Sequence, residues 1–253
     1  MSLFSLEGRT AIITGSSRGI GRAIAEQFAA HGGNVVISSR KGPVCEEVAD
    51  AINEKGQGKA IPIPASISEK EALEALVAKT REAFGKVDIC VCNAATNPYY
   101  GPISGVSDEQ FRKILDNNIL SNHWLMQMCL PDMIEQKKGS LIVVSSIGGL
   151  RGSTTIGAYN VSKAADFQLA RNYAVEYGQH NVRTNCIAPG LIRTDFAKAL
   201  WDNPAAEKAF NSNHPMRRIG LPEELAGAAV FLASDAGSYV NGQMIVVDGG
   251  TTI

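Results

Sequence analysis

Thr14-Gly15-Ser16-Ser17-Arg18-Gly19-Ile20-Gly21 stands between a short apolar run over residues 9–14 and a stretch of helical periodicity over residues 19–30. A glycine-rich turn of this kind lets the backbone approach a pyrophosphate, and the N-terminus of the next helix supplies free N–H groups and a positive dipole end. The spacing is G-x-x-x-G-x-G, without the Lys-Ser/Thr that ends a P-loop. A plain tight turn is the alternative, but the position between a first strand and a first helix favours a dinucleotide-binding turn. The residues expected to bind the cofactor here are Gly15, Ser17, Arg18, Gly19, Ile20 and Gly21.

Apolar runs of strand length alternate with helical segments along the rest of the chain. Ser68 with Glu71, and Ser107 with Gln110, have the spacing of a helix capping box. Strands that are apolar on both faces and separated by helices indicate a parallel sheet covered on both sides. No repeat or linker interrupts the pattern, so we expect one α/β domain over residues 1–253. Strands are expected over residues 9–14, 34–39, 59–64, 87–92, 139–145, 182–188 and 243–247, and helices over residues 19–30, 44–55, 69–84, 108–128, 158–177 and 222–233, with short helices around 194–213.

The composition argues against several classes of protein. The 253 residues carry a formal net charge of −1, and 45% of them are hydrophobic. This charge does not favour a nucleic-acid footprint, which usually needs a basic face. No run approaches the roughly 18 apolar residues of a membrane span, and the first residues lack a secretory signal. Five cysteines without a C-x-x-C pair suit a reducing cytoplasm, and the four histidines lack metal-binding spacing. We therefore expect a cytoplasmic protein with no metal site, no membrane partner and no nucleic-acid partner.

The end of the second expected strand bears on the choice of cofactor. An acid there accepts from the ribose 2′-hydroxyl of NAD, whereas arginine suits the 2′-phosphate of NADP. This segment contains Ser39 and Arg40, and no acid occurs before Glu46. Arg18 in the glycine turn is expected to approach the same phosphate, to which a guanidinium binds bidentately. The pattern favours NADP(H), with NAD(H) possible; the alternative is that Arg40 is only a solvated charge at the strand end.

Tyr159 and Lys163 open the helix expected over residues 158–177. Residues at i and i+4 lie on one helical face. A phenol with a pKa of about 10 is a poor acid or base near neutral pH, and a neighbouring ammonium lowers that pKa. The pair therefore indicates a tyrosine that exchanges protons, although a Y-x-x-x-K spacing alone also occurs by chance on surface helices.

Further motifs in the same order make this sequence similar to the short-chain dehydrogenase/reductase family. Asn93-Ala94-Ala95 follows the fourth expected strand, and Asn118 lies in Leu115-Asp116-Asn117-Asn118-Ile119. Ser146 follows the fifth strand and precedes Tyr159 by thirteen residues. The resemblance covers almost the whole chain and continues with Pro189-Gly190-Leu191-Ile192-Arg193-Thr194 and Asp248-Gly249-Gly250.

The resemblance implies a fold, a cofactor class and a four-residue site. The fold would be a doubly wound, Rossmann-type parallel sheet of seven strands in the order 3-2-1-4-5-6-7, with the site at the carboxyl ends of the strands. Tyr159 would exchange a proton with the substrate oxygen, and Ser146 would hydrogen-bond that oxygen. Lys163 would hold the nicotinamide ribose, and Asn118 would hold a water for proton relay. Cofactor contacts are also implied for Asn93, Ala95, Tyr159, Lys163, Pro189, Gly190, Ile192 and Thr194.

Two positions depart from the usual family pattern. Ala95 replaces a commoner glycine, which changes little. Ser66 stands where many members have an aspartate that binds the adenine amino group. A serine hydroxyl accepts a hydrogen bond there as well, and we expect the substitution to alter the affinity for adenine.

The sequence leaves the substrate open. Loops at about residues 94–106, 147–157 and 190–215 are expected to form its pocket, and their side chains are largely apolar, which favours ring or chain ketones. The chain is most similar to carbonyl and retinal reductases, while 3-oxoacyl-carrier-protein reductases and NAD-dependent sugar or polyol dehydrogenases share the motifs. A nucleotide-binding protein without turnover is disfavoured because Tyr159 and Lys163 are both present. The resemblance also implies a homotetramer. The apolar residues expected in the pocket are Tyr99, Tyr100, Leu150, Ile156, Leu191, Phe196 and Trp201.

Overall fold

Seven parallel strands form the centre of the computed structural model, which describes residues 2–253. Their order is β3-β2-β1-β4-β5-β6-β7, so the predicted topology is confirmed. The strand order reverses between β1 and β4, which places a crevice at the carboxyl ends of these two neighbours. The strands are β1 (Thr10–Thr14), β2 (Asn34–Ser38), β3 (Lys59–Pro62), β4 (Ile89–Cys92), β5 (Gly139–Val144), β6 (Val182–Pro189) and β7 (Met244–Val247).

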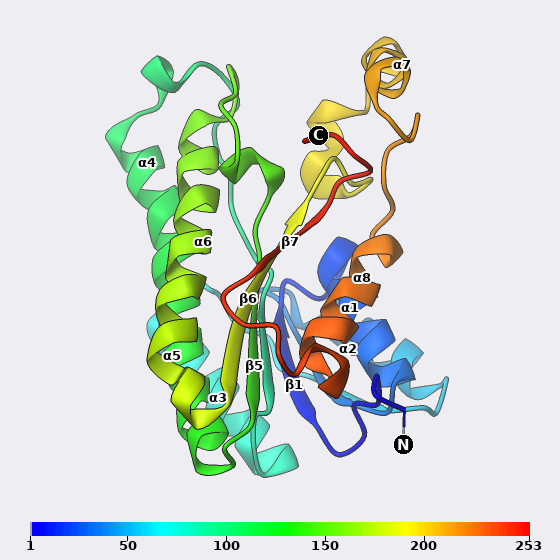
Figure 1. Cartoon of the computed structure of the whole chain (residues 1–253), viewed down its shortest axis with the longest axis vertical. Coiled ribbons are helices and arrows are strands. Elements are labelled where there is room, and N and C mark those ends of the chain that lie inside the picture. The colour runs from blue at the N-terminus through cyan, green and yellow to red at the C-terminus, as the bar shows by residue number, and fades with distance from the viewer. Residues whose placement is uncertain (1) are drawn as a thin grey trace.

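Helices cover both faces of this sheet (Figure 1). One face carries α1 (Gly19–Ala30), α2 (Gly42–Asn53) and α8 (Glu223–Ala233), and the other carries α3 (Lys70–Phe84), α5 (Ser121–Glu135) and α6 (Gly157–Tyr177). Two further helices, α4 (Asp108–Leu115) and α7 (Pro204–Asn213), lie toward the end of the molecule where the strands have their carboxyl ends. No helix within residues 2–253 is both long and apolar enough to cross a membrane.

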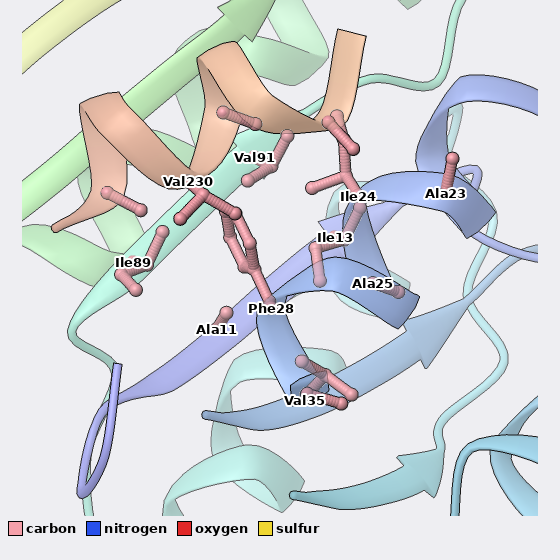
Figure 2. Packing of buried hydrophobic residues seen from close by; sticks show 14 of the residues in the cluster. Ala11, Ile13, Ala23, Ile24, Ala25, Phe28, Val35, Ile89, Val91 and Val230 are labelled. Atoms are coloured by element: carbon pink, nitrogen blue, oxygen red, sulfur yellow. The ribbon is translucent and has the colours of Figure 1, made fainter. Parts of the chain in front are cut away.

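Each face of the sheet has its own apolar core. On the α1 side, the fully buried ring of Phe28 lies between the strands and α8, near Ile13 and Val230 (Figure 2). Burying a side chain of this size stabilises the fold by about 1.5–3 kcal/mol. This packing holds the N-terminus of α1 against the end of β1, where the glycine turn lies.

The helix expected over residues 108–128 has a break in its regular geometry. Ser107 and Gln110 form the predicted capping box at the start of α4. A π-helical segment, Asp116–Leu120, then separates α4 from α5, which continues to Glu135. Two buried side chains bond to carbonyls of this segment, Ser121 Oγ to Asn117 O and Asn122 Nδ2 to Asn118 O, both at 2.6 Å. A π segment inserts one extra residue per turn and is common at functional sites.

Other boundaries differ modestly from expectation. The predicted capping role of Ser68 is wrong, because α3 begins at Lys70 with Glu69 as its N-cap and without a side-chain cap. The strands expected over residues 34–39, 59–64 and 87–92 are shorter than predicted, since residues at their ends lie in loops. Of these residues, Ser39 after β2 helps to form the crevice.

Candidate active site

A cavity of about 1550 Å³ runs across the carboxyl ends of the strands. It extends from the end of β2, past the glycine turn, to the start of α6 and the loop after β6. Of the residues predicted to be catalytic or to bind the cofactor, all within residues 2–253, Gly21 and Asn118 are the two that do not line it. Those that do are Gly15, Ser17, Arg18, Gly19, Ile20, Ser39, Arg40, Asn93, Ala95, Ser146, Tyr159, Lys163, Pro189, Gly190, Ile192 and Thr194.

The glycines of the turn have no free space for a Cβ. Gly15 has a φ of +66°, and a Cβ on it would lie 2.9 Å from Asn93 Nδ2. A Cβ on Gly21 would lie 2.5 Å from the same amide nitrogen. Asn93 Nδ2 donates to the carbonyls of Thr14, at 2.9 Å, and Gly15, at 3.2 Å, and so ties the end of β4 to the turn. The bare backbone at the N-terminus of α1 thus forms a cradle that fits a pyrophosphate.

The end of the cavity beside β2 is basic, and one of the two arginines expected there is paired with an acid. Arg40 is exposed and lines the cavity together with Ser39 and Ser66. Arg18 also lines it, but its Nη1 lies 3.1 Å from Asp195 Oδ2, and both side chains are about two-thirds exposed. The positive charge of Arg18 is therefore shared with an acid that the sequence gives no reason to place there, since 177 residues separate the two.

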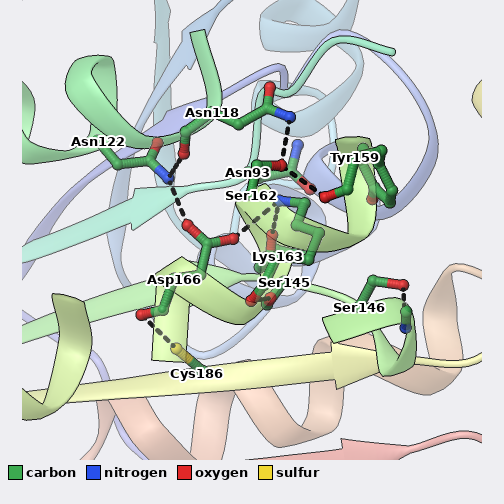
Figure 3. Close-up of polar contacts among 12 residues, drawn as sticks. Asn93, Asn118, Asn122, Ser145, Ser146, Tyr159, Ser162, Lys163, Asp166 and Cys186 are labelled. Carbon is green, nitrogen blue, oxygen red and sulfur yellow. Dashed lines mark hydrogen bonds and ion pairs between the residues drawn. The ribbon is translucent and has the colours of Figure 1, made fainter. Parts of the chain in front are cut away.

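Tyr159, Ser146 and Lys163 meet at the other end of the cavity (Figure 3). Tyr159 lies in the first turn of α6, and Lys163 follows one turn later with its Nζ 5.6 Å from the centre of the tyrosine ring. Ser146 follows β5, and its Oγ accepts from the backbone N–H of Gly148 at 3.0 Å. The serine O–H therefore stays available as a donor to a bound oxygen.

The electrostatics of Tyr159 differ from the simple expectation. Desolvation in the cavity wall raises the pKa of Tyr159, and Asp166 raises it further, while Lys163 and Ser146 lower it. The net direction is upward, so the ammonium does not outweigh burial. Lys163 thus lowers the pKa of Tyr159, in the expected direction, but burial has the larger effect.

Lys163 has a partner that the sequence analysis missed. Its Nζ donates to Asp166 Oδ2 at 3.0 Å and to the carbonyl of Val144 at 3.0 Å. Burial alone lowers the pKa of Lys163, but Asp166 reverses this and the net direction is upward. The helical spacing was a usable signal, because Asp166 follows Lys163 by three residues and Tyr159 by seven, on the face of α6 that packs on the sheet.

Asn118 lies behind the cavity wall rather than in it. It is fully buried in the π segment, and its Nδ2 donates to the Thr96 carbonyl and to Ser162 Oγ, both at 3.0 Å. Its Oδ1 accepts from the Thr96 N–H at 2.8 Å. The side chain thus anchors the loop after β4 to α6.

The substrate end of the cavity is apolar in part. Tyr100, Ile156, Leu191 and Phe196 line it as expected, together with two basic residues that were not expected, Lys113 and Arg151. The prediction is wrong for Tyr99, Leu150 and Trp201, which do not line the cavity. Instead, the indole N–H of Trp201 donates to the Thr194 carbonyl at 3.2 Å, and Arg193 lies over its ring.

Comparison with known proteins gives consistent matches over almost the full length. A family model described as enoyl-(acyl carrier protein) reductase matches residues 15–252. The chain is 39% identical over 247 residues to dehydrogenase/reductase SDR family member 4 of Bos taurus, covering 97% of this chain and 88% of the relative. It is 41% identical over 250 residues to the mitochondrial dehydrogenase/reductase SDR family member 2 of Homo sapiens, covering 98% and 88%.

Solved structures with the same fold include ligand-bound oxidoreductases. A 7α-hydroxysteroid dehydrogenase complexed with NADH and 7-oxo glycochenodeoxycholic acid is 36% identical, with a TM-score of 0.93, over 98% of this chain and 95% of its own. A putative gluconate dehydrogenase from Agrobacterium tumefaciens is 32% identical, with a TM-score of 0.94, over 99% and 98%. With the sheet order and these matches, the chain belongs to the short-chain dehydrogenase/reductase family, whose members are oxidoreductases that use nicotinamide cofactors and act on CH–OH groups.

Proposed function

We propose that this protein transfers a hydride between NADP(H) and a ketone or secondary alcohol, with Tyr159 as the acid or base. The observation that carries the proposal is the meeting of Tyr159, Ser146 and Lys163 at one end of a cavity whose other end contains a bare glycine turn and Arg40. When bound, the cofactor supplies the hydride for reduction or accepts it in oxidation.

The side chains of this chain handle the proton and the developing charge. In reduction, the Tyr159 hydroxyl donates its proton to the carbonyl oxygen, and in oxidation the phenolate takes the proton from the alcohol. Ser146 donates a hydrogen bond to the same oxygen, and a preorganised donor of this type is worth a few kcal/mol. Lys163 holds positive charge beside the phenol and is within the wall that would hold the nicotinamide ribose. Asn118 would hold a water that links Lys163 to solvent for proton relay, as the family resemblance implies.

NADP(H) is the proposed cofactor because the wall beside β2 is basic. Ser39 and Arg40 line this wall, and no acid occurs in β2 to accept from a ribose 2′-hydroxyl. Solved structures of the family contain either cofactor. The hydroxysteroid dehydrogenase above was solved with NADH. A putative gluconate 5-dehydrogenase from Beutenbergia cavernae, 35% identical, was solved with NADP. Arg40 at the end of β2 is therefore the main support for NADP(H) as the cofactor.

The proposed substrate is a hydrophobic carbonyl compound, as for a carbonyl reductase, taken up between loops at about residues 94–106, 147–157 and 190–215 of one domain. Four apolar side chains in the cavity wall support this choice. A second candidate, a sugar-acid or polyol dehydrogenase, is favoured by Lys113 and Arg151, because two cations in the wall suit a carboxylate. The free cysteines, all buried, support a cytoplasmic location.

An activity screen separates these possibilities. The purified chain is assayed with NADPH and NADH against apolar ring and chain ketones, 3-oxoacyl thioesters, and oxidised sugar acids. We expect NADPH oxidation with the apolar ketones. Turnover only with sugar acids would favour the second candidate, and binding of NADPH without turnover of any carbonyl would indicate a nucleotide-binding protein instead of an enzyme.

A further inference from the structure

A buried carboxylate lies directly behind the proposed proton-exchanging pair. Asp166 is fully buried, and Lys163 is 2% exposed. Asp166 Oδ2 accepts from Lys163 Nζ at 3.0 Å, and Asp166 Oδ1 accepts from Asn122 Nδ2 at 3.2 Å (Figure 3). Both carboxylate oxygens therefore have donors, which is the condition under which a buried ion pair is tolerated.

The same contacts connect Asp166 to the π segment. Asn122 Nδ2 also donates to the carbonyl of Asn118 at 2.6 Å. Asn118 in turn donates to Ser162, whose hydroxyl bonds to the Tyr159 carbonyl at 2.7 Å. Asp166 thus belongs to a closed set of contacts that fixes Lys163 and the first turn of α6 relative to each other.

On this basis, and resting on the proposed function, we propose that Asp166 is a positioning residue for the reaction: it is the counter-ion that holds Lys163 in place and sets how tightly the Tyr159–Lys163 pair retains its proton. An ammonium next to a carboxylate forms a nearly neutral pair, so it offers less attraction to a phenolate than a lone ammonium does. Asp166 therefore keeps the phenol protonated to higher pH. This is the form that donates to a carbonyl, so Asp166 extends to higher pH the range in which the pair is ready for reduction.

The direction of the effect does not depend on which group of the pair loses its proton first. If Tyr159 ionises, the new phenolate is repelled by Asp166; if Lys163 loses its proton, the favourable contact with Asp166 is lost. Both losses are made harder by the carboxylate: burial is the main cause of the raised pKa of Tyr159 and Asp166 adds to it, while Asp166 opposes the burial that lowers the pKa of Lys163. Removal of the carboxylate charge must then move the first proton loss of the pair to lower pH.

Among the described residues that contact Asp166 or Lys163, no second carboxylate could replace the charge of Asp166. Cys186 of β6 faces Asp166 and donates from Sγ to its main-chain carbonyl at 3.5 Å, and burial raises the pKa of this thiol, so it stays neutral. Ser145, directly after β5, donates to the Lys163 carbonyl at 2.8 Å. The π segment and α5 present amides, and α4 contributes Lys113 to the wall of the cavity.

The test is the variant Asp166→Asn, whose amide oxygen can still accept from Lys163 while the charge is removed. The pH dependence of kcat/KM for alcohol oxidation is measured, and in parallel tyrosinate absorbance is titrated, with the Tyr159→Phe signal subtracted. We expect the apparent pKa in both titrations to fall by about one pH unit or more, because a charge at this short distance shifts a pKa by about that amount. Asp50→Asn, which removes a carboxylate from the exposed face of α2, is the matched control and should leave both titrations unchanged.

The outcomes separate this proposal from the proposed function. A downward move of either titration in Asp166→Asn supports the coupling, and titrations that both coincide with those of the unaltered chain overturn it. An early tyrosinate signal in a protein that turns over no carbonyl would support the role of Asp166 while contradicting the proposed function. If Asp166→Asn does not fold, the smaller uncharged Asp166→Ser takes its place with the same expectation, because a purely structural ion pair would change stability without moving the pH profile.

Discussion

At the scale of single residues, Tyr159 is the group on which the proposed chemistry depends most. Tyr159→Phe removes the hydroxyl and keeps the ring that contacts Phe196, at 5.9 Å between ring centres. General acid–base catalysis contributes about 10²–10⁴-fold, so we expect turnover to fall by this order while NADPH affinity stays nearly unchanged. Steady-state kinetics and a binding titration measure the two effects. Tyr239→Phe, at a fully exposed tyrosine, is the matched control, and near-normal turnover in Tyr159→Phe would rule out the mechanism.

Arg40 carries the cofactor assignment at the same scale. A charge-assisted contact to a 2′-phosphate contributes about 1.5–3 kcal/mol to binding, and about 1.4 kcal/mol corresponds to a tenfold change in affinity. Arg40→Ala should therefore raise the KM for NADPH about tenfold or more, with little change for NADH. Arg112→Ala, at an exposed arginine of α4 paired with Asp108, is the control. Equal losses with both cofactors would instead mean that Arg40 stacks on the adenine, and a preference of the unaltered chain for NADH would overturn the assignment.

The residues that sequence reasoning found and missed differ in the range of their contacts. Tyr159, Lys163 and the turn glycines follow local spacings on one helix or one turn, so they can be read from the sequence. The Arg18–Asp195 pair cannot, because its partners are far apart in the chain. Asp166 has local spacing to Lys163, yet a buried aspartate on a sheet-packed helix face is unusual for a charged residue, and it received no role.

At the scale of elements, the glycine turn combines backbone strain with close packing, and two glycines separate these effects. Gly15 and Gly56 have φ values of +66° and +68°, but only at Gly15 would a Cβ meet neighbouring atoms. Gly56→Ala should cost about 1–2 kcal/mol, the strain of the left-handed conformation alone. Gly15→Ala should lower the free energy of unfolding by more than Gly56→Ala does, because the added methyl group lies against Asn93. It should also weaken NADPH binding. Thermal unfolding measures the stability of each variant, and a titration measures its affinity for NADPH. Equal stabilities of the two variants, with unaltered NADPH binding in Gly15→Ala, would contradict the role of the turn as a cradle for the pyrophosphate.

The elements themselves show where periodicity is informative. Apolar runs of strand length predicted every strand of the sheet, because burial on both faces leaves a strong signal, whereas the strand order was implied only by the family resemblance. The π segment Asp116–Leu120 was not predicted, since one extra residue in a turn barely alters the pattern of apolar positions in the surrounding helix. The segment is also held by tertiary contacts of Asn118 with Thr96 and Ser162, which a local pattern does not reveal.

At the scale of the whole molecule, we propose a homotetramer of about 108 kDa, four times the chain mass of 26.9 kDa. The outer face of α6 supports the proposal, because Val161 and Val175 are 45% and 85% exposed there. Light scattering at micromolar concentration should give this mass, and a value near 27 kDa would rule out the assembly. Val175→Lys should lower the mass, whereas Leu3→Lys, at an exposed apolar residue of the N-terminal segment, should not.

The strand order also has a consequence for how a chain emerging from the ribosome can fold. The first 62 residues contain β1, β2 and β3, which are neighbours at one end of the sheet and need only two successive crossovers to pair. The other edge of β1 is completed by β4, which aligns Cys90 with Ile12. Until residue 92 has been synthesised, β1 therefore presents an open row of backbone hydrogen-bonding groups, and such edges invite pairing with other chains. The interval between the synthesis of β3 and that of β4, in which α3 must also be made, is therefore a stage at which a nascent chain of this topology is exposed to misassembly.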